Sequence, residues 1–220
     1  MPRKRRITAG GYTYHVMNRA VGKGVLFETP SDFNAFQTVI REVSIEEPRV
    51  RIVAYCAMPT HWHFLLWPSA DGVLPSFMKE LTSVHATRWN TAHGRVGHGA
   101  VYQSRYKSIP IVGDEHLLWV WRYVERNALR AHLVARAEDW PWGSLGQAQH
   151  GCDFLSPGPI ELPSNWVELV NTPQTEAELD AFRKHVESGI PFGGKWPEQR
   201  KRGRPRVFDT YEKRGQTPFV

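Results

Sequence analysis

Two histidines separated by one tryptophan are the residues of this 220-residue chain best suited to binding a metal. They are His61 and His63, at the start of the apolar run HWHFLLW. If that run is a strand, both imidazoles project to one face of the sheet while Trp62 projects to the other. Two such imidazoles are a natural ligand pair for a divalent cation. Because the chain holds ten histidines, two ordinary packed or surface histidines are the alternative interpretation.

A second polar group lies on residues 115–134, where the spacing of apolar residues predicts a helix. Tyr123, Asn127 and Arg130 share one face of this helix. A phenol can act as a nucleophile, and an amide oxygen one turn away can complete a metal site. The alternative is a helix with a half-exposed tyrosine and a solvated polar side.

The elements that must position these groups follow from hydrophobic periodicity and from turn residues. We expect strands at 12–20, 50–57, 61–67 and 101–111, and helices at 31–46, 74–92 and 115–134. Ser31-Asp32 is expected to cap the first helix. The order β-α-β-β-α-β predicts an α+β fold, a ferredoxin-like antiparallel sheet with helices on one face. The last helix can then lie across the open face.

The formal charge of +6 is unevenly distributed along the chain. Residues 1–6 carry +4 and residues 195–220 carry +5, whereas residues 7–136 hold fourteen basic against ten acidic side chains. Residues 137–194 carry −7. Two basic tails around a mildly basic body favour a polyanionic partner, and a role in solubility alone is the alternative.

Cysteine content and hydropathy indicate the compartment. The two cysteines, Cys56 and Cys152, offer neither a disulfide framework nor a zinc-ligand spacing. No apolar run approaches the roughly 18 residues of a membrane span, and the basic N-terminus lacks a signal-peptide core. We therefore expect a cytoplasmic protein with no membrane partner.

Several motifs, in the right order and at the right separations, carry a resemblance to a known family. They are Met58-Pro59 before His61-Trp62-His63, the stretch VYQSRYKS at 101–108, YVERNALRA at 123–131, YHVMNR at 14–19 and WPWGS at 140–144. Together they resemble the REP-associated tyrosine transposases, bacterial relatives of the single-tyrosine HUH transposases. The likeness covers roughly residues 12–146.

The resemblance implies a metal-dependent endonuclease and strand transferase that acts on single-stranded DNA. It implies that His61 and His63 hold Mg²⁺ or Mn²⁺, with Asn127 as the third protein ligand. Tyr123 would attack the scissile phosphate and leave a 5′-phosphotyrosine and a free 3′-hydroxyl. The implied substrate is a REP-type hairpin with a short single-stranded foot. The family further implies a nucleoid-associated protein acting as a monomer, with a dimer as the alternative.

Cations and aromatic residues around this site are the expected DNA contacts, through phosphate binding or base stacking, and a solvated rim is their alternative role. An Arg-Gly-Arg-Pro-Arg segment in the C-terminal tail suits a narrow minor groove, or is a generic basic tail. The expected contacts are Arg3, Arg5, Arg6, Asn18, Arg19, Tyr102, Arg105, Tyr106, Lys107, Arg130, Arg202, Arg204 and Arg206.

The chain departs from the family where Asn127 is followed by Ala128 in place of proline, which predicts that the helix runs on past Asn127. Nothing in the sequence shows a lost ligand. Two alternative functions nevertheless stay open: a catalytically silent DNA-binding regulator, and a metal nuclease that uses water.

We divide the chain into four segments: a basic arm at 1–11, a DNA-processing domain at 12–146, an acidic extension at 147–194 and a basic tail at 195–220. The extension is expected to be mostly irregular, with one helix near 174–188, and the tail to be disordered alone. The acidic stretch suggests that it competes with DNA for the basic body until a proper hairpin displaces it.

Overall fold

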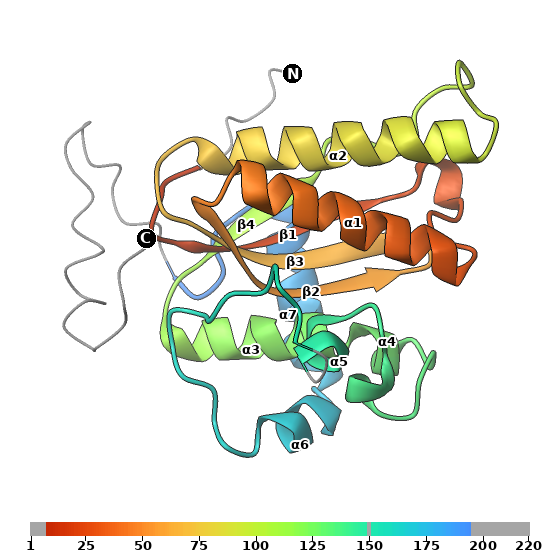
Figure 1. The fold of residues 1–220 in the computed structure, drawn as a ribbon. Helices are drawn as coiled ribbons and strands as arrows, with labels where there is room; N and C mark the ends of the chain where they lie inside the picture. Colours follow the sequence, from red (N-terminus) through yellow and green to blue (C-terminus); the bar gives the residue numbers. More distant parts are fainter. Residues whose placement is uncertain (1–7, 149–150, 195–220) are drawn as a thin grey trace.

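A four-stranded antiparallel sheet, in the order β2-β3-β1-β4, forms the centre of the computed structural model (Figure 1). The structure describes residues 8–148 and 151–194. The strands are β1 (Thr13–Arg19), β2 (Val50–Met58), β3 (His61–Pro68) and β4 (Lys107–Ile111). The helices are α1 (Pro30–Glu46), α2 (Val73–Ala92), α3 (Asp114–Glu125), α4 (Asn127–Arg130), α5 (Ser144–Ala148), α6 (Trp166–Asn171) and α7 (Glu176–Ser188). The described residues also contain two short 3₁₀ helices, Val21–Lys23 and Ala137–Asp139.

Side chains of β3 alternate between two environments, as strand geometry requires. Trp62 and Phe64 are fully buried beneath α1, where the Phe36 ring lies 6.2 Å from each of theirs. The helices α1 and α2 cover this face, and α3 lies across the opposite one (Figure 1). The ferredoxin-like α+β prediction is therefore confirmed, including a last helix on the open side of the sheet.

The fourth strand is shorter than the sequence predicts. It starts at Lys107, whereas residues 101–106 form an irregular loop over the end of β1. The loop is held there by the backbone bond from Gln103 N to Arg19 O, 3.0 Å, and by a bridge between Ala20 and Tyr102. Because of these contacts, residues 101–106 do not form the extended strand that their β-branched and aromatic residues predict.

The prediction of a single helix over 115–134 is wrong, because the helix is interrupted at Arg126, between α3 and α4, and the chain stays helical past Asn127 only as far as Arg130. The Asn127 side chain bonds the last turn of α3 at this break: its Nδ2 donates to Tyr123 O, 2.8 Å, and to Val124 O, 3.3 Å. A side-chain amide thus takes carbonyls that backbone N–H groups would take in a continuous helix.

Residues 137–194 are more ordered than predicted, because they form α5 and α6 as well as the expected α7. Their buried aromatic residues, Trp140, Phe154, Trp166 and Phe182, belong to the same hydrophobic core as the sheet. Their backbone also pairs with both edges of the sheet. The bonds are Ala57 N to Trp142 O and Ser156 N to Ile52 O at β2, and Phe192 N to Pro110 O and Val112 N to Phe192 O at β4. No helix within the described residues is long and apolar enough to span a membrane.

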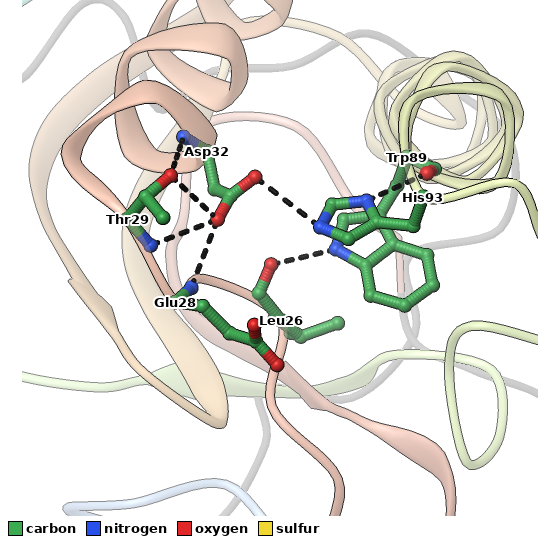
Figure 2. A network of polar contacts seen from close by, with 6 residues as sticks. All are labelled: Leu26, Glu28, Thr29, Asp32, Trp89 and His93. Atoms are coloured by element: carbon green, nitrogen blue, oxygen red, sulfur yellow. Dashed lines mark hydrogen bonds and ion pairs between the residues drawn. The ribbon is translucent and has the colours of Figure 1, made fainter.

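A polar network joins the start of α1 to the end of α2 (Figure 2). The cap of α1 is Thr29, one turn earlier than Asp32 and not Ser31-Asp32 as predicted. Thr29 and Asp32 form a reciprocal capping box, and Asp32 Oδ1 lies 3.4 Å from His93 Nε2 at the end of α2. Trp89 adds a bond from its Nε1 to Leu26 O, 2.7 Å.

This network predicts that Asp32→Asn lowers the free energy of unfolding by about 1 kcal/mol at pH 7, measured by urea unfolding. Burial raises the pKa of Asp32, but hydrogen bonds from the N–H groups of Thr29 and Glu28 outweigh it and lower the pKa overall. A lowered pKa contributes stability above the unfolded value of about 4, and this contribution is lost as the pH falls through the folded pKa.

The difference between the native chain and Asp32→Asn should therefore shrink between pH 7 and pH 3. Ser31→Ala is the control, because Ser31 is exposed in the same first turn of the helix and should change stability by less than about 0.5 kcal/mol. A deficit of Asp32→Asn that stays constant with pH would contradict the role of the charged carboxylate.

Candidate active site

The two histidines of β3 lie on the sheet face that α3 crosses. Their ring centroids are 5.0 Å apart, and the two planes are nearly perpendicular at 84°. The Nδ1 atom of His61 lies 2.9 Å from Thr60 Oγ1, and that of His63 lies 2.9 Å from His15 Nε2. With both Nδ1 atoms engaged, the Nε2 atoms are the nitrogens left to bind another group.

Burial keeps this pair uncharged near neutral pH. It lowers the pKa of His61 to about 4, assisted by the positive charges of Arg19 and Arg130. Burial also lowers the pKa of His63 well below its usual value, and the neighbouring His61 adds to the effect. Neutral imidazoles carry the free lone pair that a metal ligand needs, so no proton has to be displaced at pH 7.

Tyr123 reaches the same face from α3. Its ring lies 5.7 Å from that of His63, edge to face, and is stacked on Trp119 at 5.7 Å. The guanidinium carbon of Arg130 lies 5.1 Å from the Tyr123 ring centre. Burial raises the pKa of the Tyr123 phenol, and Arg130 opposes this rise through its charge and a hydrogen bond. The phenol, the cation and the imidazole pair thus form one cluster.

A buried carboxylate fixes the helix that carries Tyr123. Glu125 accepts hydrogen bonds from Trp121 Nε1, 3.2 Å, from Ser144 Oγ, 2.8 Å, and from Trp166 Nε1, 2.7 Å. Burial raises the pKa of Glu125, and these three donors counter the effect. Since Ser144 and Trp166 both lie in residues 137–194, this part of the chain helps to set the position of α3.

Two arginines strengthen this attachment. Arg126 Nη1 donates to Val170 O, 2.8 Å, and Arg122 Nη2 donates to Pro173 O, 3.1 Å. These acceptors lie at and just beyond the C-terminal end of α6, where carbonyl groups lack partners within the helix and attract cations. Neither arginine figured in the sequence-based prediction.

Asn127, predicted to be the third metal ligand, lies at the break between α3 and α4. It is fully buried, and its Oδ1 accepts a hydrogen bond from Arg130 Nη2, 2.7 Å. An amide oxygen has a second lone pair, so this bond leaves it able to bind another group. Among residues 8–148 and 151–194, no group of three His, Cys, Asp or Glu side chains could hold a metal ion. An ion bound by the imidazole pair would therefore need Asn127 or substrate oxygens to complete its shell.

Helix α7 covers this cluster. Phe182 is fully buried, and its ring lies 4.8 Å from that of Tyr123 and 5.1 Å from that of His15. As a result Tyr123 is only 7% exposed. The sequence placed a helix here, but its contact with the tyrosine was not predicted, because no local pattern reports which surface a distant helix covers.

Three of the cations predicted to contact DNA, Arg19, Arg105 and Lys107, are exposed, and Arg130 is half-buried. Arg19 lies opposite His61 in the β1–β3 register, and Lys107 lies opposite Met17 on the other side of β1. Arg105 is exposed in the loop before β4. Their role in DNA binding stays a prediction, as does that of Arg130.

The other predicted contacts have internal partners or lie outside the described residues. The Tyr102 hydroxyl bonds His85 Nδ1, 2.6 Å, and accepts from Trp62 Nε1, 3.1 Å. Tyr106 and Asn18 are buried, so base stacking or DNA contact by either would need the loop at 101–106 to move. Arg3, Arg5, Arg6, Arg202, Arg204 and Arg206 lie outside the described residues.

The chain was compared with known protein families, curated proteins and solved structures. No curated protein matches this chain. The family model for IS200-like transposases matches residues 8–127, more than half of the chain. That segment contains β1 to β4, the imidazole pair and Tyr123, and it ends at Asn127.

Two solved structures resemble the chain. One is a REP-associated tyrosine transposase bound to a REP hairpin, with a TM-score of 0.56 and 18% identity over 74% of this chain and 96% of that one. The other, from Deinococcus radiodurans R1, was assigned provisionally as a transposase and has a TM-score of 0.41 and 20% identity over 57% of this chain and 96% of that one. The first likeness supports the fold, and the family match over 8–127 shows that the chain belongs to the IS200-like transposases.

Proposed function

We propose that the protein is a metal-dependent endonuclease and strand transferase that cleaves single-stranded DNA through Tyr123. The observation that carries this proposal is the position of the Tyr123 ring, 5.7 Å from His63 within a cluster that also holds His61 and Arg130. A nucleophile, a pair of neutral imidazoles and a cation on one sheet face are what phosphodiester transesterification requires.

The chemical step exchanges one phosphodiester for another. The Tyr123 oxygen forms a bond to phosphorus and loses its proton, while the bond from phosphorus to the 3′ oxygen breaks and that oxygen gains a proton. The products are a 5′-phosphotyrosine and a free 3′-hydroxyl. Because the number of ester bonds is unchanged, attack by another 3′-hydroxyl can reverse the step and join strands without an external energy source.

His61 and His63 would hold Mg²⁺ or Mn²⁺ through Nε2, with the Asn127 oxygen as a third donor. When bound, the ion polarises a non-bridging oxygen of the scissile phosphate and offsets charge developing there. Arg130 contributes a fixed positive charge beside the phenol, and Trp119 supports the phenol ring by stacking.

The substrate proposed is a hairpin with a single-stranded foot, of the kind found at REP elements. One structural relative is described as bound to such a hairpin, which supports the choice. Arg19 and Lys107 flank the site on neighbouring strands and are exposed, so they are placed to contact the phosphates of the foot.

Tyr123→Phe tests the nucleophile. With Mn²⁺ and a labelled REP-type hairpin, the native chain should give a protein–DNA adduct that survives denaturation, measured on denaturing gels. The variant removes only the attacking oxygen, so adduct formation should fall by at least about a thousandfold.

Tyr55→Phe is the matched control, because it removes a buried hydroxyl from the face of β2 that packs under α1, where it bonds Gln37. It should form the adduct at the native rate. An adduct in Tyr123→Phe would refute the assignment. Cleavage without an adduct would favour a nuclease that uses water, and tight binding without cleavage would favour a DNA-binding regulator.

Phe182→Ala tests whether α7 has to leave Tyr123 for reaction. Truncation after residue 136 would also remove Trp140 and Trp166 from the hydrophobic core, so a single substitution is the cleaner test. Losing a fully buried phenylalanine costs about 3–5 kcal/mol and should loosen α7. The initial rate of adduct formation should therefore rise several-fold.

Glu187→Ala, at an exposed position on α7, controls for altered helix stability and should leave the rate unchanged. An unchanged or lower rate in Phe182→Ala would mean that α7 supports the tyrosine ring and does not block access to it.

A further inference from the structure

A third histidine lies beneath the candidate metal site and was not singled out from the sequence. His15, on β1, is 1% exposed and projects to the same sheet face as Met17, which pairs with His63. The plane of its ring lies within 19° of that of His63, with the ring centroids 5.1 Å apart. Its Nε2 lies 2.9 Å from His63 Nδ1.

Only one of these two nitrogens carries the shared proton, and the assignment follows from the role of His63. If His63 binds an ion through Nε2, its Nδ1 carries the hydrogen and donates it to His15 Nε2. The opposite arrangement puts the hydrogen of His63 on Nε2 and blocks the lone pair. The partner at Nδ1 therefore decides whether His63 is ready to bind a metal.

We propose that His15 is a positioning residue, whose Nε2 accepts a hydrogen bond from His63 Nδ1 and holds His63 in the tautomer and orientation that present Nε2 to the metal. This inference rests on the proposed function, because it assigns a supporting residue to that same site. His15 is not itself a ligand in this arrangement, since the nitrogen that faces the site is bonded to His63.

The surroundings of His15 suit this role. The Phe182 ring lies 5.1 Å away, and the Tyr123 ring lies 5.9 Å away and nearly perpendicular to the His15 ring. Burial favours the neutral form of His15, which can accept a hydrogen bond at Nε2 while Nδ1 carries its own hydrogen. A neutral acceptor orients His63 without placing a second charge in the core, where an unpaired charge is costly.

The first test needs neither a variant nor a metal. In the full chain labelled with ¹⁵N, two-bond correlation spectra distinguish protonated from unprotonated ring nitrogens at pH 7. We expect His63 to carry its hydrogen on Nδ1 and His15 to have an unprotonated Nε2. A His63 ring protonated on Nε2 overturns the proposal.

The second test measures the affinity for Mn²⁺ by electron paramagnetic resonance titration of variants. His15→Phe keeps a flat ring against His63 but removes the acceptor, so the Kd for Mn²⁺ should rise 10- to 100-fold. His15→Gln restores an acceptor near the position of Nε2 and should stay within about threefold of the native Kd. Thermal unfolding of each variant reports whether the fold is kept.

His85→Phe is the matched control. His85 is also buried, at 3% exposed, but packs beside Phe27 and Phe36 on the opposite face of the sheet. The Kd of His85→Phe for Mn²⁺ should equal that of the native chain. A native Kd in His15→Phe, or a loss in His15→Gln as large as in His15→Phe, overturns the proposal.

The failure of the proposed function would look different. If the native chain bound no Mn²⁺ and formed no adduct, the transesterification proposal would fall. The tautomer measurement would still decide whether His15 accepts the hydrogen bond of His63, even if His15→Phe failed to fold.

Discussion

The alternation of side chains along β3 is the constraint on which the rest of the molecule depends. Within three consecutive residues, Trp62 enters the core under α1 while His61 and His63 face α3. One face of the sheet is therefore committed to apolar packing, and the other can hold neutral imidazoles beside a phenol. A shift of one residue in register would bury both histidines under α1 and destroy core and site together.

The second requirement is that α3 holds Tyr123 over that face, and here residues 137–194 are decisive. Glu125 is bonded to Ser144 and Trp166, and Arg126 is bonded to the end of α6. Residues 137–194 thus support the helix that carries the proposed nucleophile. The same segment continues into α7, which covers the tyrosine with Phe182. The residues that hold α3 in place and the helix that covers Tyr123 therefore belong to the same part of the chain.

Much of this arrangement could be predicted from the sequence because it is encoded locally. The period of two at 61–67 gave the shared face of the histidines, and the helical period placed Tyr123 and Asn127 one turn apart. The late start of β4, the helix break at Arg126 and the contact of Phe182 with Tyr123 depend on partners distant in the sequence. His15 could have been found from strand parity, but only once the pairing of β1 with β3 was known.

The backbone of Phe192 is bonded to the outer edge of β4, close to the helix that covers Tyr123. β4 ends the sheet, so its outer edge is where a second copy of the chain could add a strand. Phe192 already bonds Pro110 and Val112 there, and its ring lies 5.0 Å from that of Phe182. Strand addition at this edge would have to peel off the segment that anchors α7. Strand addition at β4 would therefore also uncover the tyrosine.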